Sequence, residues 1–192
     1  MKKKHILMLK SFIKVMCGNK KEIKSIIPDA YYQSIYTIDY ENLNNVTTLL
    51  FDIDNTIAKV DDLDVPLETQ ELFSKLKQKF KILLFSNNSE ARAKPIAEKL
   101  DIPMIYNAGK PAKEAYDNAL KLVNSTKENT VAIGDQLITD IVGAKKYGIK
   151  AILVDQLSKE NNVQTSLAQK LQKHMIKKLS KKEMFKQGNY YH

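Results

Sequence analysis

The chain has 192 residues, of which 43% are hydrophobic and 8% aromatic, so it can bury a core and wholesale disorder is excluded. No apolar run approaches the roughly 20 residues of a membrane-spanning helix. A single cysteine excludes an internal disulfide and fits a reducing compartment. The net charge of +9 belongs to the two ends, because residues 1–24 carry +7, residues 170–192 carry +6, and the part between them carries −4.

The first 45 residues fall into two parts. Residues 1–24 are basic, with apolar side chains among the lysines. Lys10 and Lys14 interrupt the apolar part and no small-residue cleavage site follows, so we expect this segment to be retained. Residues 25–45 have no clear periodicity and predict an ordered lead-in with short helical turns.

From residue 46, segments typical of strands alternate with segments typical of helices. Short apolar runs predict strands at 46–53, 81–86, 102–106, 130–135 and 150–155. Apolar residues on one helical face predict helices at 66–80, 89–100, 111–123 and 137–148. Gly148 is typical of a helix C-terminal cap. This alternation with short connections predicts an α/β fold: a Rossmann-like, doubly wound, mostly parallel sheet of about five strands, flanked by helices.

The last segment contains a basic amphipathic helix. Its apolar residues recur every four positions: Val163, Leu167, Leu171, Met175 and Leu179. This helix either packs on the domain with its lysine stems covering the edges, or lies on an anionic membrane surface. The N-terminal segment allows the same two interpretations.

We therefore predict three parts: a basic amphipathic N-terminal segment (1–24), an α/β core (25–157) and a basic amphipathic C-terminal helix (158–192).

Polar side chains follow four of the predicted strands. They are Asp52, Asp54, Asn55 and Thr56 after the first, Ser86, Asn87 and Asn88 after the second, Lys110 after the third, and Asp135 and Asp140, which follow Gly134, after the fourth. In a parallel sheet these residues converge on one edge. Carboxylates brought together repel one another unless a cation lies among them, and all-oxygen ligation suits Mg²⁺. We predict Asp52, Asp54 and Asp135 as the metal ligands.

A lysine, a hydroxyl and turn amides beside these carboxylates are the components of a phosphate site. Asp52 is predicted as a nucleophile at the tip of its strand. Asp54 would protonate the leaving group and then activate water to hydrolyse an aspartyl-phosphate. Ser86 would hydrogen-bond a phosphoryl oxygen, and Lys110 would neutralise developing charge.

The remaining residues are predicted in supporting roles. Asp140 would orient Asp135 or Lys110. Thr56, Asn87 and Asn88 are predicted to contact the substrate.

The motifs "DIDNT", Ser86 after an apolar strand, Lys110 before a helix, and "GDQLITD" occur in this order, and they resemble the haloacid dehalogenase (HAD) superfamily of phosphatases. Together with "PDAYYQSIYTIDYENL" and "SNN" they are similar to the YqeG family of subfamily IIIA, over roughly residues 26–157. Eukaryotic relatives of that family include a mitochondrial phosphatidylglycerophosphate phosphatase. The resemblance implies a phosphatase and suggests a lipid phosphomonoester.

Many HAD enzymes carry a cap domain inserted between these motifs. Here the segments from Thr56 to Ser86 and from Ser86 to Lys110 must each hold a helix and a strand, which leaves no room for a large cap. An open site would admit a phosphate that projects from a membrane, a protein or a nucleic acid.

The sequence leaves three hypotheses for the function. In the first, the chain is cytoplasmic, lies peripherally at the inner face of a membrane, and hydrolyses phosphatidylglycerophosphate with Mg²⁺. In the second, it is a soluble phosphatase of a phosphoprotein, nucleotide or sugar phosphate. In the third, it is a non-catalytic phosphate- or RNA-binding module. No RNA-recognition motif is visible and aromatic residues are not interleaved with the basic runs, so nucleic acid is not the expected partner.

Overall fold

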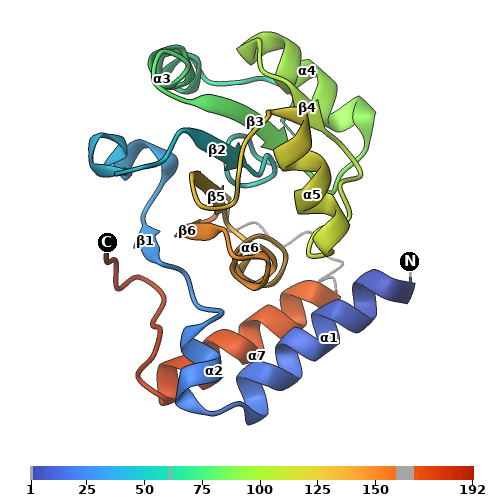
Figure 1. Cartoon of the computed structure of the whole chain (residues 1–192), viewed down its shortest axis with the longest axis vertical. Helices are drawn as coiled ribbons and strands as arrows, with labels where there is room; N and C mark the ends of the chain where they lie inside the picture. Colours follow the sequence, from blue (N-terminus) through green and yellow to red (C-terminus); the bar gives the residue numbers. More distant parts are fainter. Residues whose placement is uncertain (1, 61, 159–166) are drawn as a thin grey trace.

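A six-stranded parallel sheet lies between two layers of helices in the computed structural model, which describes residues 2–60, 62–158 and 167–192 (Figure 1). The strands are β1 (Ala30–Tyr32), β2 (Thr48–Phe51), β3 (Lys81–Phe85), β4 (Met104–Ile105), β5 (Thr130–Gly134) and β6 (Lys150–Val154). They are ordered β1-β6-β5-β2-β3-β4, and all five pairings are parallel. The predicted doubly wound α/β fold is confirmed.

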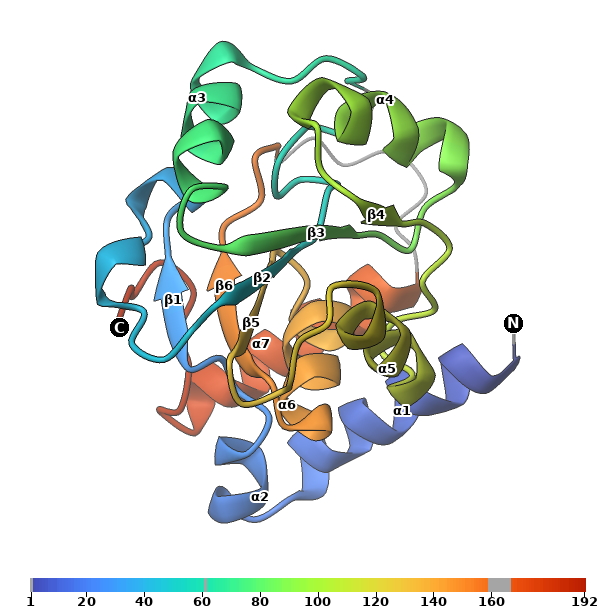
Figure 2. The same cartoon turned by 45° about the horizontal axis from the view of Figure 1, so that its top comes forward.

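The helices divide between the two faces of the sheet. The α-helices are α1 (Lys2–Cys17), α2 (Lys20–Lys24), α3 (Leu67–Leu76), α4 (Glu90–Leu100), α5 (Lys113–Leu122), α6 (Gly143–Tyr147) and α7 (Leu167–Lys181). Helices α3 and α4 cover one face, and α1, α5, α6 and α7 cover the other (Figures 1 and 2). Strand residues alternate accordingly, with Leu49 and Phe51 facing α3 and α4, and Leu50 facing the other layer.

Strand β1 was not predicted and makes the sheet one strand wider than expected. It has three residues, of which only Tyr31 is buried, so neither an apolar run nor an alternating pattern marks it in the sequence. Its pairing with β6 and an antiparallel bridge between Tyr31 and Tyr191 hold it in the sheet. The short helical turns predicted for residues 25–45 are present as η1 (Ile35–Thr37) and η2 (Tyr40–Asn42).

The segment predicted as one helix at 137–148 is divided. A π-helical turn, η3 (Leu137–Val142), precedes α6, and Gly148 caps α6 with a left-handed backbone (φ 95°), as predicted. Gln136 O accepts hydrogen bonds from the backbone N–H groups of both Asp140 and Ile141. The amphipathic pattern alone does not distinguish this wider turn from an α-helix.

The two terminal helices pack on the α5–α6 side of the sheet. α1 contacts α7 and η3, and Val15, Met175 and Leu179 are fully buried in the same core as Leu50. Part of the predicted amphipathic pattern therefore faces the domain. Val163, the first residue of that pattern, lies outside the described residues. No helix of the described chain is long and apolar enough to cross a membrane.

Candidate active site

The site lies where the strand order reverses. β2 and β5 are neighbours at the centre of the sheet, and the chain leaves them toward opposite edges, with β3 next to β2 and β6 next to β5. In open α/β sheets, ligands bind outside the carboxyl ends of the strands at such a point. Asp52 directly follows β2 and Asp135 directly follows β5.

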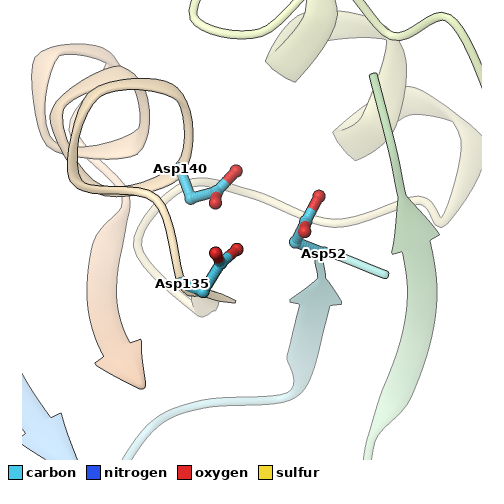
Figure 3. A group of neighbouring side chains, drawn as sticks. All are labelled: Asp52, Asp135 and Asp140. Carbon is cyan, nitrogen blue, oxygen red and sulfur yellow. The ribbon is translucent and has the colours of Figure 1, made fainter. Parts of the chain in front are cut away.

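Three carboxylates gather at this point. Asp52, Asp135 and Asp140 are buried, and one oxygen of each lies within 4.8 Å of the others (Figure 3). The π-turn brings Asp140 back over the end of β5, where a Cβ on Gly134 would lie 2.5 Å from Asp140 Oδ2. Glycine at this position is therefore required for the carboxylate to approach the strand end. Asp140 Oδ2 also accepts the Gln136 N–H at 3.0 Å.

Lys110 connects two of these carboxylates. Its Nζ donates to Asp52 Oδ1 and to Asp140 Oδ1, both at 2.7 Å, and the residue is only 2% exposed. The backbone of Lys110 is fixed by Asn87, whose Oδ1 accepts the Lys110 N–H at 2.7 Å and whose Nδ2 donates to Lys110 O at 3.1 Å. The loop after β3 therefore positions the lysine that neutralises part of the cluster.

The charge balance of the cluster requires a further positive charge. Three carboxylates and one ammonium leave a formal charge of −2 when all four groups are ionised. Burial, opposed by Lys110, raises the pKa of Asp52 to about 7. Burial and the charges of Asp52 and Asp140 raise the pKa of Asp135 well above 3.8. Burial lowers the pKa of Lys110, but Asp140 and Asp52 outweigh it and raise that pKa above 10.5. Protons or a cation must therefore offset the excess negative charge.

The donor set fits a hard divalent cation. Among the described residues, Asp52 Oδ2 is buried and takes part in no hydrogen bond. Within the described part of the chain, the hydrogen bond to Asp135 Oδ1 is a long one of 3.4 Å from Thr56 Oγ1. Oxygen ligands without histidine or cysteine suit Mg²⁺. These residues could therefore hold a metal ion.

Asp54 lies apart from the three carboxylates. Its Oδ1 accepts a hydrogen bond of 2.8 Å from Arg92 Nε, and its Oδ2 accepts one of 3.3 Å from Asn88 Nδ2. Asp140, predicted only as a supporting residue, occupies the third place in the carboxylate group. A role for Asp54 in metal binding stays a prediction.

The other predicted residues lie around this edge. Ser86 is buried after β3, and its Oγ accepts the Asn88 N–H at 3.0 Å. Asn87 is engaged with the Lys110 backbone, and Thr56 faces Asp135. The predicted contacts of Ser86, Thr56, Asn87 and Asn88 with a substrate stay predictions.

Comparison with known proteins agrees with this geometry. Residues 107–180, which include Lys110, Asp135 and Asp140, match the model of the HAD-hydrolase-like family. The chain is 33% identical over 162 residues to "Probable phosphatase YqeG" of Bacillus subtilis (strain 168), covering 83% of this chain and 94% of that protein. The chain belongs to the HAD-hydrolase-like family.

Two solved structures are similar to this chain at low sequence identity. The crystal structure of an uncharacterized protein from Listeria monocytogenes serotype 4b is 20% identical with a TM-score of 0.50, over 62% of this chain and 88% of that chain. The HAD-hydrolase YfnB from Bacillus subtilis, bound to magnesium, is 16% identical with a TM-score of 0.49, over 62% of this chain and 90% of that chain.

Between the HAD motifs, the described residues contain only α3 and β3 from Asp52 to Ser86, and α4 and β4 from Ser86 to Lys110. No cap domain is evident in this part of the chain, as predicted.

Sequence reasoning missed two residues of this HAD site. Arg92 on α4 is buried, and besides holding Asp54 it donates to Lys59 O and to Asp62 O, both at 2.6 Å. Gln156, after β6, donates from Nε2 to Asp135 Oδ2 at 2.8 Å. Arg92 is the only arginine of the chain, and it stands four residues before Ile96, on the apolar face of the predicted helix. A cation on that face is the signal that could have identified it. No pattern marks Gln156.

The raised carboxylate pKa values predict a pH dependence of stability. The folded-state pKa values of Asp52 and Asp135 lie above their unfolded value of 3.8, so the folded protein binds more protons over this interval. The free energy of unfolding contributed by these groups is present below about pH 4 and is lost as pH rises through about 7. In a chelator, we therefore expect wild-type stability, measured against that of Asp135→Asn by thermal unfolding, to fall between pH 5 and pH 8.

Millimolar Mg²⁺ should restore stability mainly at the higher pH, because binding to the ionised cluster stabilises the folded state. The contrary result would be a difference in melting temperature, wild type minus Asp135→Asn, that increases from pH 5 to pH 8 in chelator. That result would contradict this account.

Proposed function

We propose that this HAD-family protein hydrolyses phosphomonoesters, with Asp52 as nucleophile and Asp54 as general acid and base. The observation that carries the proposal is the buried group of Asp52, Asp135, Asp140 and Lys110 at the point where the strand order reverses. The similarity to a protein named as a probable phosphatase supports the same reaction.

The geometry around Asp52 suits in-line attack on phosphorus. Lys110 donates to Oδ1, and Oδ2 has no hydrogen-bond partner among the described residues, so one carboxylate oxygen can attack the phosphorus while the other would ligate the metal. A bond forms from the attacking Asp52 oxygen to phosphorus, and the bond from phosphorus to the ester oxygen breaks. Asp54 donates a proton to the departing alkoxide, then removes one from the water that hydrolyses the aspartyl-phosphate. Lys110 partly neutralises the charge of Asp52 and of the transferred group.

Mg²⁺ is the proposed cofactor, held by Asp52 and Asp135 with Asp140 beside them. When bound, it would offset the repulsion between the carboxylates and the phosphate dianion. Ser86 and the nearby turn amides would bind phosphoryl oxygens.

The proposed substrate is phosphatidylglycerophosphate at an anionic membrane surface. Ile6, Leu9 and Ile13 on α1 are 53%, 51% and 50% exposed, and Lys10 beside them is exposed too. The carboxyl ends of β3 and β4 face the side of the molecule on which the N-terminal end of α1 lies (Figure 2). An exposed apolar stripe with lysines favours a lipid surface, and the described chain has no cap domain to exclude a large substrate. The alternative is a soluble phosphomonoester.

The decisive experiment measures Mg²⁺-dependent phosphate release from phosphatidylglycerophosphate in mixed micelles, beside a panel of soluble phosphomonoesters, with Asp52→Asn as the blank. A strong preference for the lipid supports the membrane function. Equal or better turnover of a soluble ester leaves the chemistry and removes the lipid assignment. No turnover of any ester would refute the phosphatase proposal.

A test of the acid–base role uses Arg92. The Arg92 guanidinium is fixed on two backbone carbonyls and orients the Asp54 carboxylate. In Arg92→Gln, we expect kcat/KM for an alkyl phosphate to fall by roughly 10²-fold, because the poor leaving group needs the proton. For p-nitrophenyl phosphate, whose leaving group needs no proton, the fall should stay below about fivefold. The quantity kcat/KM is used because it reports the first chemical step.

The control is Lys94→Gln, an exposed position on the same helix, which should leave both values unchanged. If Arg92→Gln lowers kcat/KM equally for both esters, Arg92 supports only the loop and not the acid.

A further inference from the structure

A pocket of about 150 Å³ lies beside the proposed metal ligand Asp135. It is enclosed by the loops after β5 and β6, by α7, and by the segment that follows α7. Its apolar walls include Leu137, Ile176 and Phe185, and its polar side includes Gln172 and Lys173. The proposed reaction does not use this pocket, although Asp135 is both a lining residue and a member of the carboxylate group.

The pocket and the carboxylate cluster are connected by hydrogen bonds. Gln156, a lining residue, donates to Asp135 Oδ2 at 2.8 Å. Gln172 Oε1 on α7 accepts the Leu137 N–H at 2.9 Å, two residues after Asp135. The C-terminal helix is therefore bound to the loop that carries a proposed metal ligand, so α7 does more than cover the sheet.

The outer wall of the pocket is also fixed in place. Asp155 accepts hydrogen bonds from Tyr31 OH and, at 2.6 Å, from Tyr190 OH. The Gly188 N–H donates to Tyr31 OH at 3.1 Å, and the rings of Tyr31 and Phe185 lie 5.2 Å apart. These contacts hold the segment after α7 against β1, so the wall formed by Phe185 is ordered before any ligand binds.

We propose that this pocket binds the end of the alcohol that lies farthest from the ester oxygen, and that Lys173 pairs with a second anionic group there. The inference rests on the proposed function. A pocket of this size suits a short polyol headgroup. Carboxylates Asp135 and Asp155 also line the pocket, so an anionic group is accepted only next to the Lys173 ammonium.

This assignment gives the C-terminal helix a part in specificity. The cluster at the ends of β2 and β5 binds the phosphate and has no means of distinguishing one alcohol from another. Residues from α7 and the following segment line the pocket together with Asp135. A phosphodiester in a lipid headgroup and a second phosphate on a free metabolite offer the same chemistry to Lys173.

The test compares Lys173→Glu with Lys177→Glu, an exposed lysine one turn further along α7 that does not line the pocket. Three substrates are used with Mg²⁺: p-nitrophenyl phosphate, which lacks a second anion, the water-soluble deacylated headgroup of phosphatidylglycerophosphate, and the lipid itself in micelles. We expect Lys173→Glu to raise KM at least tenfold for the soluble headgroup and to leave p-nitrophenyl phosphate within about twofold. Lys177→Glu should leave both soluble substrates unchanged.

The outcomes separate the pocket from the proposed function. Wild-type turnover of p-nitrophenyl phosphate tests the phosphatase itself. A tenfold effect of Lys173→Glu on the soluble headgroup and on the lipid supports a headgroup subsite. A similar effect on the soluble headgroup with none on the lipid supports the subsite with a soluble metabolite as its source. If the Lys173 and Lys177 variants have equal effects, and only on the lipid, the lysines merely attract α7 to the anionic lipid surface. That result overturns the pocket assignment. No effect on any substrate also overturns it.

A second variant tests the cavity independently of charge. Gln187→Trp places a large side chain at an exposed position on the pocket rim. We expect it to raise KM for the headgroup and to leave p-nitrophenyl phosphate unchanged. Unchanged KM for the headgroup in a folded Gln187→Trp protein contradicts binding inside the pocket.

Discussion

Asp52→Asn should lower kcat by roughly 10⁴- to 10⁶-fold, the loss that follows removal of a covalent nucleophile. The amide keeps the size of the side chain and can still accept a hydrogen bond from Lys110 Nζ, which lies 2.7 Å from Asp52 Oδ1. What disappears is the carboxylate oxygen that attacks the phosphorus. Phosphate release under saturating substrate and Mg²⁺ measures the effect.

The same variant should be more stable than wild type when metal is removed. Burial raises the pKa of Asp52 to about 7, so at pH 8 the folded wild-type protein keeps a carboxylate where it is unfavourable. An amide removes that charge, and we expect the melting temperature in chelator at pH 8 to rise by about 2–8 °C. The opposed signs of the two effects, lost activity with gained stability, are typical of a functional residue.

Asp101→Asn is the matched control for Asp52→Asn. Asp101 is exposed at the end of α4, where its backbone is left-handed (φ 52°), a conformation that Asn adopts readily. We expect no change in turnover or melting temperature. Turnover above one hundredth of wild type in Asp52→Asn, after Asp52→Ala has excluded reversion by deamidation, would falsify the nucleophile assignment.

The sequence predicted the centre of the fold better than its margins. The strands β2, β3 and β5 are apolar runs buried on both faces. Packing does not explain the polar residues that directly follow these buried strands, so the site is located where those strands end. β1 is stabilised by contacts with β6 and Tyr191, which are distant in sequence, so no local pattern could reveal it.

The same distinction holds for individual site residues. Asp52 and Asp135 are positioned by the strands that precede them, and their place follows from local sequence. Asn87 was predicted to face a substrate, and it holds the backbone of Lys110, which lies 23 positions further along the chain. Arg92 reaches Asp54 from α4. Such partners depend on how the loops meet in three dimensions, which a periodic pattern does not encode.

Lys110→Met should have the largest effect on stability. The substitution keeps an unbranched, apolar stem of similar length and removes the ammonium that lies 2.7 Å from both Asp52 Oδ1 and Asp140 Oδ1. Breaking a buried ion pair by removing one partner costs roughly 3–5 kcal/mol. We expect that decrease in the free energy of unfolding at pH 8 in chelator, with a fall in kcat of at least about 10²-fold in Mg²⁺.

The pH dependence of this loss separates charge from packing. Without Lys110, the pKa of Asp52 rises further above its unfolded value, so the buried carboxyl group is protonated at pH 5. The decrease in the free energy of unfolding caused by Lys110→Met is therefore smaller at pH 5 than at pH 8. Between pH 5 and pH 8 the stability difference between wild type and Lys110→Met should widen. Lys113→Met, an exposed lysine in the first turn of α5, should change neither stability nor activity.

Adding Asp140→Asn to Lys110→Met completes the test. The double variant removes one negative charge from the unbalanced cluster, and its amide can donate toward Asp52 where the lysine did. We expect it to recover much of the lost stability at pH 8 while kcat stays low, because the charge on the transferred phosphoryl group remains unneutralised. If the double variant is no more stable than Lys110→Met, the cost comes from lost packing of the lysine stem, and the electrostatic account of this HAD site is wrong.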